Sequence, residues 1–391
     1  MAKRITLDFL KTESASGVVL AAAALAGIVM ANSPGDGLYF RFLAAPITIQ
    51  IGNFAETLSV LDWVKHGLMA VFFFVVGLEI KYEVLRGELS NPRRLALPIA
   101  AAMAGMLVPA LVYLGFNLGG AVQGWPTPIA TDIAFSIAAL AIAGPRLPPA
   151  LRVFLLTLAI VDNLGAVAVI GVVFTAKLRI AALVAAMATL ALMGLLTRWR
   201  GAPYLFYAIG FLLVWGFTLK SGISTSVAGV AAAMTIPIEP RKPGRPGVLE
   251  DFMDSLHPYV AFGILPLFAF CAAGFDFGRL SLSDLFGPIA LGVAAGLFIG
   301  KPLGVFGAIG LLCGLKLTRR PMGARWAELF GMSLLTGIGF TMSLFIGGLA
   351  FPGGGPEQAQ VRAGVIAGSL MATLAGMAVL AWAQARRQAE G

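Results

Sequence analysis

The 391-residue chain is too apolar for an ordinary soluble protein, since 59% of its residues are hydrophobic and 12% are charged, against roughly a quarter charged in a typical soluble domain. The net charge of +9 is interpreted as a topology signal rather than a nucleic-acid footprint, because basic residues of polytopic membrane proteins gather in cytoplasmic loops. The apolar runs are as long as transmembrane helices and exceed the roughly ten-residue strands of outer-membrane barrels. An all-α integral membrane protein without nucleic-acid partners is therefore predicted.

Apolar runs alternate with charged or Gly/Pro-rich breaks along the whole chain. They predict about twelve membrane-spanning helices, near residues 15–32, 60–81, 95–117, 122–143, 151–175, 179–197, 203–219, 222–238, 256–273, 286–314, 328–350 and 361–383. If the N-terminus is cytoplasmic, only seven of the 28 Lys and Arg residues fall in outside segments, namely Arg41, Lys65, Lys177, Arg179, Lys220, Arg279 and Arg362. The positive-inside rule then predicts that both termini are cytoplasmic.

Two connections between the predicted spans have distinctive sequences. Residues 45–58 alternate β-branched and other residues around Gly52-Asn53, which predicts a short β-hairpin on the outer side. Its exposed strand edge could pair two subunits, and a simple capping loop is an equally good interpretation. Residues 238–251 are interpreted as a polar Pro/Gly linker that divides the chain into unequal halves.

The run 151–175 carries Asp162 and Asn163 near its middle. A carboxylate at that depth of a bilayer is costly, so Asp162 must face protein or water and is a candidate functional residue. At the 3.6-residue period, Gly165 and Ala166 share its side of the helix, which allows another backbone to pack closely. The central question is which group partners Asp162.

Two of the predicted spans are interrupted, 122–143 by prolines and 328–350 by glycines. Residues 131–136 (TDIAFS) and 336–341 (TGIGFT) share the pattern T-x-I-x-F-[ST], which indicates an internal repeat. Each copy follows a proline-containing span and precedes an uninterrupted one, and an odd number of crossings separates the two. They predict two inverted three-helix units, 95–175 and 286–383, whose interrupted helices mark the central site of a transporter.

Interrupted helices leave unpaired backbone groups and helix-dipole ends inside the membrane. Asp132, beside Thr131 at the first interruption, could serve as a structural counter-charge for N-terminal helix ends. Lys301 could offset the opposite ends or pair with Asp162. If Lys301 pairs with Asp162, a cation that binds Asp162 would break the pair and release the lysine proton. Cation binding and proton release would then be coupled in a single antiport step. The same span carries glycines four residues apart, a spacing that admits close contact with a neighbouring helix: Gly292, Gly296, Gly300 and Gly304.

Glu79 lies at the cytoplasmic end of the 60–81 span and is followed by Lys81, Glu83 and Arg86. A solvated helix end with i,i+4 pairs explains this cluster, and a pH-sensing group or cation funnel is the alternative. The sequence has no metal-ligand spacing, nucleotide-binding loop or other enzyme motif. We therefore predict no catalytic residues and no cofactor, and energy must come from an ion gradient.

Several segments resemble the NhaA family of bacterial sodium/proton antiporters: FFFVVGLEIK (72–81), ATDIAF (130–135), LAIVDNLGA (158–166), LPLFAF (265–270), GKPLG (300–304) and TGIGFTMS (336–343). The resemblance covers nearly the whole chain. It implies a single transporter domain over 1–391, with twelve helices, of which helices 4 and 11 are broken and cross, a six-helix core, and interface helices within 12–85 and 203–275. It also implies homodimers through the 45–58 hairpin and a multi-pass location in the inner membrane.

By this resemblance, Asp162, Thr131, Asp132 and Lys301 serve in ion binding and proton exchange. Gly337 and Gly339 belong to a broken helix, and Glu79 is a candidate pH sensor. The chain departs from the family at Asn163, where the family has a second aspartate that is its principal cation ligand. Asparagine offers a neutral oxygen and removes one titratable group. The family's histidine before helix 8 is also absent, and Ser224 stands in its place.

The function implied is secondary active exchange of cytoplasmic Na⁺ or Li⁺ for external protons, driven by the proton gradient, with Asp162 and Asn163 as the Na⁺ ligands. Asn163 leaves three alternatives open. The chain could be a disabled or trapped variant, a natural variant that uses Asp162 alone, or a carrier of the same architecture for another solute. A scaffold that does not transport is the rival from a different functional class.

Overall fold

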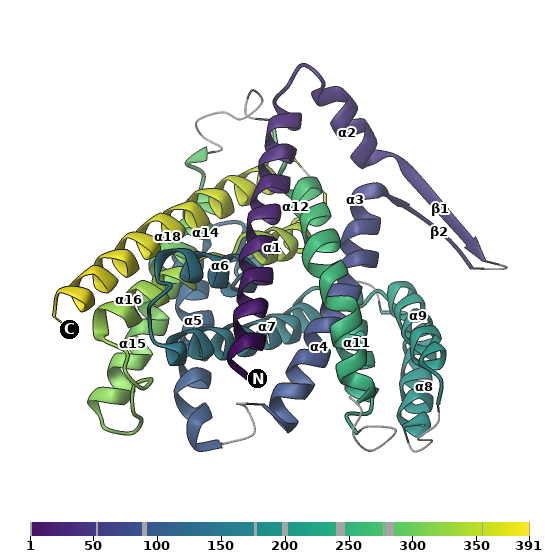
Figure 1. The fold of residues 1–391 in the computed structure, drawn as a ribbon. Helices are drawn as coiled ribbons and strands as arrows, with labels where there is room; N and C mark the ends of the chain where they lie inside the picture. The colour runs from purple at the N-terminus through teal and green to yellow at the C-terminus, as the bar shows by residue number, and fades with distance from the viewer. Residues whose placement is uncertain are drawn as a thin grey trace. The chain divides into compact units, whose positions relative to one another are not determined.

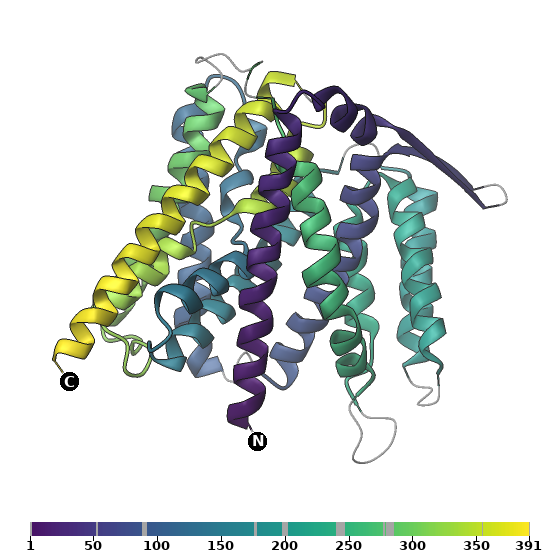
Figure 2. The same ribbon diagram turned by 45° about the horizontal axis from the view of Figure 1, so that its top comes forward.

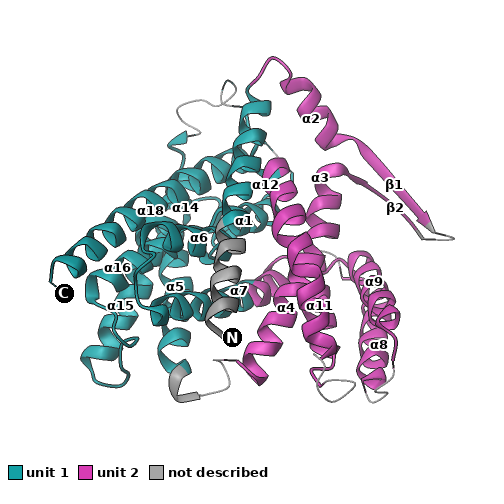
Figure 3. Ribbon diagram, in the orientation of Figure 1, with its two compact units in different colours: residues 1–32, 91–166, 272–391 teal, residues 33–90, 167–271 magenta. Residues whose placement is uncertain are grey.

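The computed structural model describes residues 2–51, 54–87, 92–175, 178–197, 202–239, 247–276, 278, 285–353 and 355–390, and most of them are helical. The chain divides into two compact units, each assembled from segments that are distant in sequence (Figure 3). Unit 1 comprises residues 1–32, 91–166 and 272–391, and unit 2 comprises residues 33–90 and 167–271.

Unit 1 contains both interrupted segments. Its helices are α1 (Ala2–Ala31), α5 (Pro92–Asn117), α6 (Ile133–Ala143), most of α7 (Pro149–Val173), α14 (Pro288–Ala295), α15 (Lys301–Gly314), α16 (Trp326–Leu335), α17 (Phe340–Ala350) and α18 (Gly355–Ala389). Two short 3₁₀ turns, η3 (Val122–Gly124) and η4 (Thr127–Ile129), precede α6, and the π-helical turn η7 (Gly296–Gly300) joins α14 to α15. The long helix α18 packs along α14 and α16, as Figures 1 and 2 both show.

Unit 2 contains the hairpin. Its elements are α2 (Asp36–Ala44), β1 (Pro46–Ile51), β2 (Phe54–Ser59), α3 (Val60–Trp63), the π-helical turn η1 (Val64–Leu68), α4 (Met69–Leu85), the end of α7, α8 (Ile180–Leu196), α9 (Tyr204–Ser221), α10 (Thr225–Thr235), α11 (Val248–Tyr259), the π-helical turn η5 (Val260–Ile264) and most of α12 (Leu265–Ala273). The two strands pair antiparallel, from Pro46 opposite Ser59 to Ile51 opposite Phe54. The hairpin predicted over 45–58 is thereby confirmed, while Gly52 and Asn53 lie outside the described residues.

The helices of the described segments fit a multi-pass membrane protein. Six are long and apolar enough to cross a membrane, or up to nine if each bent helix pair is one span. The shorter apolar helices α8 and α10 coincide with two further predicted runs. The predicted all-α membrane class with a small hairpin is confirmed at this level, while the count of twelve spans stays a prediction.

Helix α11 begins at Val248, inside the stretch that the sequence assigned to a linker, so that boundary was wrong. The Glu250 carboxylate accepts a hydrogen bond from the Gly247 N–H at 3.0 Å, and Val248 and Leu249 are buried. Side-chain capping together with this burial stabilises the extra turns. The polar composition of the segment concealed both effects.

The glycines spaced four apart place η7 and α15 directly on α5. A Cβ atom at Gly300 would lie 2.7 Å from the Cα of Pro109, and one at Gly296 would lie 3.2 Å from the Pro109 carbonyl oxygen. Side chains larger than hydrogen therefore cannot fit at this contact without displacing backbone, as the spacing predicted. The close contact helps to bury Lys301, the first residue of α15.

Candidate functional site

The two interrupted helices of unit 1 meet at their interruptions. The turns over 122–129 and helix α6 are bent by 42° relative to one another, and so are α16 and α17. The Asp132 N–H donates to the Ile338 carbonyl oxygen at 2.7 Å, and the Thr131 hydroxyl oxygen lies 3.0 Å from the Thr336 carbonyl oxygen. The Asp132 N–H, which has no helical partner on its own segment, is thus satisfied by a carbonyl of the other segment.

Asp132 is buried where two helices begin. Its carboxylate accepts a hydrogen bond from the Phe135 N–H at 3.2 Å, as the N-cap of α6. It also accepts from the Thr341 N–H at 3.0 Å and from the Thr341 hydroxyl at 2.5 Å, in the first turn of α17. A negative charge at helix N-termini is stabilised by their free N–H groups and by the helix dipole. This geometry favours the counter-charge role for Asp132.

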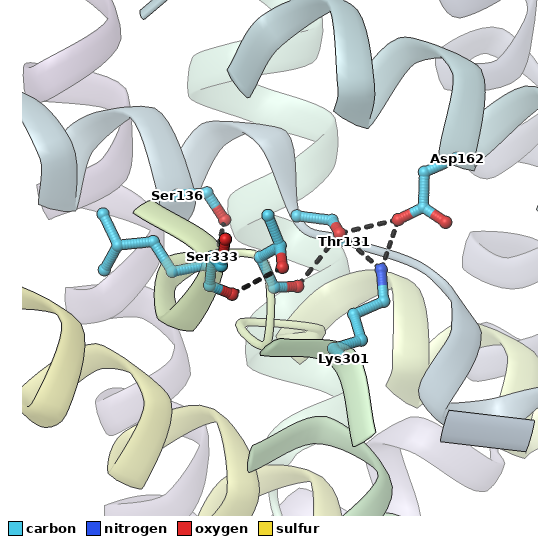
Figure 4. Close-up of polar contacts among 7 residues, drawn as sticks. Thr131, Ser136, Asp162, Lys301 and Ser333 are labelled. Carbon is cyan, nitrogen blue, oxygen red and sulfur yellow. Dashed lines mark hydrogen bonds and ion pairs between the residues drawn. The ribbon is translucent and has the colours of Figure 1, made fainter. Parts of the chain in front are cut away.

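Lys301 and Asp162 form an ion pair between Nζ and Oδ2, and Thr131 contacts both (Figure 4). The Thr131 hydroxyl accepts a hydrogen bond from Lys301 Nζ at 2.5 Å and donates to Asp162 Oδ2 at 2.6 Å. Lys301 is 0% exposed and Asp162 is 1% exposed. Of the two roles that the sequence left open for Lys301, the structure shows the pairing with Asp162.

Buried oxygen atoms without hydrogen-bond partners in the described part of the chain occur at Asp162 and at Asn163, the next residue of α7. Asn163 is 2% exposed, and neither its amide oxygen nor its amide nitrogen has a partner among the described residues. The same is true of Asp162 Oδ1, the carboxylate oxygen that Lys301 does not contact. Buried polar atoms normally find partners, and carboxylate and amide oxygens are preferred ligands of hard cations. The side-chain oxygens of these residues are therefore suited to serve as ligands of a small metal ion.

Side-chain hydroxyl groups donate hydrogen bonds to backbone carbonyls in the last turn of α16. Ser136 donates to the Leu335 carbonyl oxygen at 2.9 Å, and Thr336 donates to the Ser333 carbonyl oxygen at 2.7 Å (Figure 4). Ser136 belongs to the repeated T-x-I-x-F-[ST] pattern, as does Thr341 beside Asp132, so that pattern could have identified both residues. Ser333 had no comparable signal, because serine is common on buried helix faces of membrane proteins.

Gly337 and Gly339 lie at the interruption between α16 and α17, where the sequence placed them. A Cβ atom at Gly337 would lie 3.1 Å from Ala372 Cβ, and one at Gly339 would lie 2.8 Å from a methyl carbon of Leu297. The interruption is therefore packed tightly against η7 and α18. Close approach, rather than an unusual backbone conformation, explains these glycines.

Glu79 lies on α4 and belongs to unit 2, whereas the residues of the buried ion pair belong to unit 1. The basic residues that follow it have structural partners. Lys81 Nζ donates to the carbonyl oxygens of Met234 and Ile236, both at 2.6 Å, and Arg86 pairs with Glu250 at 3.3 Å. Among the described residues, no cluster of three His, Cys, Asp or Glu could hold a metal ion.

The fold and the site define a polytopic helical membrane protein built around a buried acid–lysine pair. Residues 7–380 match the family Na⁺/H⁺ antiporter 1, and the chain belongs to this family. It is therefore a transporter rather than an enzyme, and the resemblance drawn from the sequence motifs is confirmed.

Curated relatives that match most of the chain are named Na⁺/H⁺ antiporter NhaA. The relative from Sphingopyxis alaskensis is 46% identical over 379 residues, which cover 95% of this chain and 89% of the relative. The relative from Rhodospirillum rubrum is 45% identical over 388 residues, covering 96% of both chains. The relative from Paramagnetospirillum magneticum is 47% identical over 380 residues, covering 95% of both chains.

Proposed function

We propose that this protein exchanges Na⁺, or Li⁺, for protons at Asp162. The observation that carries the proposal is the buried ion pair of Asp162 with Lys301, which lies where the two interrupted helices meet. The names of the relatives support Na⁺ and H⁺ as the transported ions. Neither the site nor the relatives favour a different solute.

Competition for one carboxylate supplies the coupling. Lys301 contacts Asp162 Oδ2, whereas Oδ1 has no partner among the described residues. A Na⁺ ion that binds Asp162 replaces the lysine ammonium as the counter-ion, because two adjacent cations repel each other in a medium of low dielectric constant. Lys301 then releases its proton, and the returning proton restores the ion pair and expels Na⁺. In this scheme, the neutral oxygens of Asn163 and Thr131 complete the shell around Na⁺.

Asp132 acts in this proposal as a positioning residue that holds the two interruptions together. Its hydrogen bonds to Phe135 and Thr341 join the N-terminal ends of α6 and α17. Glu79 is proposed as a pH-sensing residue outside the exchange site. A Glu79→Gln variant that transports at the wild-type rate with an unchanged pH profile would remove that role.

The architecture that we propose has twelve spans with both termini cytoplasmic, in the bacterial inner membrane. Segments 95–175 and 286–383 are the inverted repeats, which the equal 42° bends and the shared T-x-I-x-F-[ST] pattern support. Helices within 12–85 and 203–275 form the interface part. The 45–58 hairpin joins two copies, a role supported by the exposed β-branched side chains of Ile47 and Ile49 on β1.

The proposed function is tested by purified protein in proteoliposomes that carry an imposed pH gradient and a fluorescent pH indicator. Addition of NaCl or LiCl is expected to dissipate the gradient with the wild-type protein, and KCl is not. Asp162→Asn is expected to abolish the response, whereas Glu56→Gln, a neutralised carboxylate on β2, retains it. Full activity of Asp162→Asn would overturn the proposal. Calorimetry at high pH distinguishes a carrier, which binds Na⁺, from an inert scaffold, which does not.

A further inference from the structure

The loop over 315–325, which connects α15 to α16, presents apolar and basic side chains together on the protein surface. Leu317 is 69% exposed and Met322 is 86% exposed. The side chains of Lys316, Arg319 and Arg320 in the same loop are also exposed. Because the loop directly follows a helix long and apolar enough to cross the membrane, it lies at the level of the membrane surface.

The backbone of this loop is held in a defined conformation at Lys316. Lys316 has φ of 58°, and no other non-glycine residue in the described part of the chain has a positive φ. Its N–H donates to the Cys313 carbonyl oxygen at 3.1 Å, and the Leu317 N–H donates to the Leu312 carbonyl oxygen at 3.0 Å. Glycine is the usual residue at such a helix end. A lysine therefore occupies a backbone position that would be less strained without its side chain.

Ionic contacts connect this loop to the end of α18. Arg387 donates to the Gly323 carbonyl oxygen at 2.8 Å and pairs with Glu328 at 2.7 Å, while Arg325 pairs with Glu390 at 2.7 Å. The carboxylates of Glu328 and Glu390 are thus already engaged by arginines. The surplus positive charge of the loop is not neutralised by them.

Four basic residues in this region have no carboxylate partner within the described part of the chain: Lys316, Arg319, Arg320 and Arg386. The Arg386 guanidinium lies 4.4 Å from the ring centre of Trp382, which is partly exposed. Tryptophan is enriched at the level of lipid headgroups. Unpaired cations beside an interfacial aromatic ring are complementary to lipid phosphates.

We propose that the 315–325 loop and Arg386 bind the headgroups of anionic phospholipids. The cations contact lipid phosphates, while Leu317 and Met322 insert into the adjoining acyl region. Basic residues next to a membrane helix attract anionic lipids, and apolar side chains between them add burial in the interface. A nucleic acid or an acidic peptide would match the charge but would leave these apolar side chains in water.

Native mass spectrometry of the detergent-purified full chain with added phosphatidylglycerol tests the proposal. The triple variant Lys316→Gln/Arg319→Gln/Arg320→Gln is expected to bind the lipid roughly fivefold more weakly for each charge removed. The matched variant Arg241→Gln/Lys242→Gln/Arg245→Gln removes the same charge from the 238–251 segment and is expected to retain the lipid. Equal loss in both variants, or no loss in the first, would overturn the proposal.

Two further measurements separate lipid binding from a loss of folding and from the binding of a free anion. Lys316→Gly preserves the left-handed turn, so it is expected to maintain or raise the melting temperature while weakening phosphatidylglycerol binding. An unchanged affinity in this variant would contradict a contact from Lys316. Inorganic phosphate and phosphatidylcholine are expected not to stabilise the protein against heat, whereas phosphatidylglycerol does. Equal stabilisation by inorganic phosphate would assign the site to a free anion and overturn lipid binding.

Discussion

The carboxylate of Asp132 accepts two hydrogen bonds from Thr341, one from its backbone N–H and one from its hydroxyl. Because Asp132 also caps α6, a single side chain joins the N-terminal ends of two helices that belong to the two different interrupted segments. The Asp132 carboxylate, which precedes the first turn of α6, therefore holds the two interrupted segments in a fixed position relative to each other.

Asp132→Ala should destabilise the protein by about 3 kcal/mol, because it removes an N-cap and two hydrogen bonds to a buried carboxylate. Asp132→Asn keeps an oxygen that can cap α6, so a smaller loss is expected. The measurement is thermal unfolding of the detergent-solubilised protein. If both variants melt at the wild-type temperature, Asp132 is not a positioning residue.

Lys301→Met should abolish exchange and lower stability by about 3 to 5 kcal/mol, because it leaves the buried Asp162 carboxylate without its counter-charge. The double variant Lys301→Met/Asp162→Asn removes both charges, so it is expected to recover most of the stability without recovering transport. Unfolding measurements on the single and double variants give the coupling energy. Additive losses would mean that the pair contributes no coupling.

Asn163→Asp should make exchange sensitive to the membrane potential. In the proposed scheme, with one carboxylate beside Lys301, each turnover exchanges one Na⁺ for one proton and moves no net charge. A second carboxylate must be neutralised by a further proton when Na⁺ leaves, so the variant carries net charge. Proteoliposomes with a potassium-diffusion potential measure this difference, and Asn163→Ala is the control for altered packing. If the wild-type protein and Asn163→Asp depend equally on the membrane potential, the expected difference in protons exchanged per Na⁺ is contradicted.

Glu328→Gln should lower the melting temperature by weakening the contact between the first turn of α16 and the end of α18. Glu328 is fully buried, accepts a hydrogen bond from the Arg325 N–H at 2.9 Å and pairs with Arg387. Loss of a partner of a buried ion pair leaves Arg387 uncompensated. A double-mutant cycle with Arg387→Gln is expected to give a coupling of about 1 to 3 kcal/mol. A coupling near zero would show that the contact is incidental.

Some features follow from the sequence because they depend on local periodicity and on the cost of burying charge in lipid. Helix-length apolar runs require helices, and a carboxylate such as Asp162 within one of them requires a protected environment. The four-residue spacing from Gly292 to Gly304 determines a close helix contact. Alternation around residues 52–53 was sufficient to predict the hairpin. Each of these signals is contained within a few consecutive turns or residues.

The tertiary structure decided which groups meet. Lys301 and Asp162 are 139 residues apart, and the sequence left open whether the lysine would pair with Asp162 or offset helix ends. The contact between Asp132 and Thr341, and that between Glu328 and Arg387, likewise depend on how separate helices pack. Helical periodicity specifies the face on which a side chain lies, whereas its partner is selected by the packing of helices distant in sequence, where a buried charge is stable only beside an opposite charge or hydrogen-bond donors.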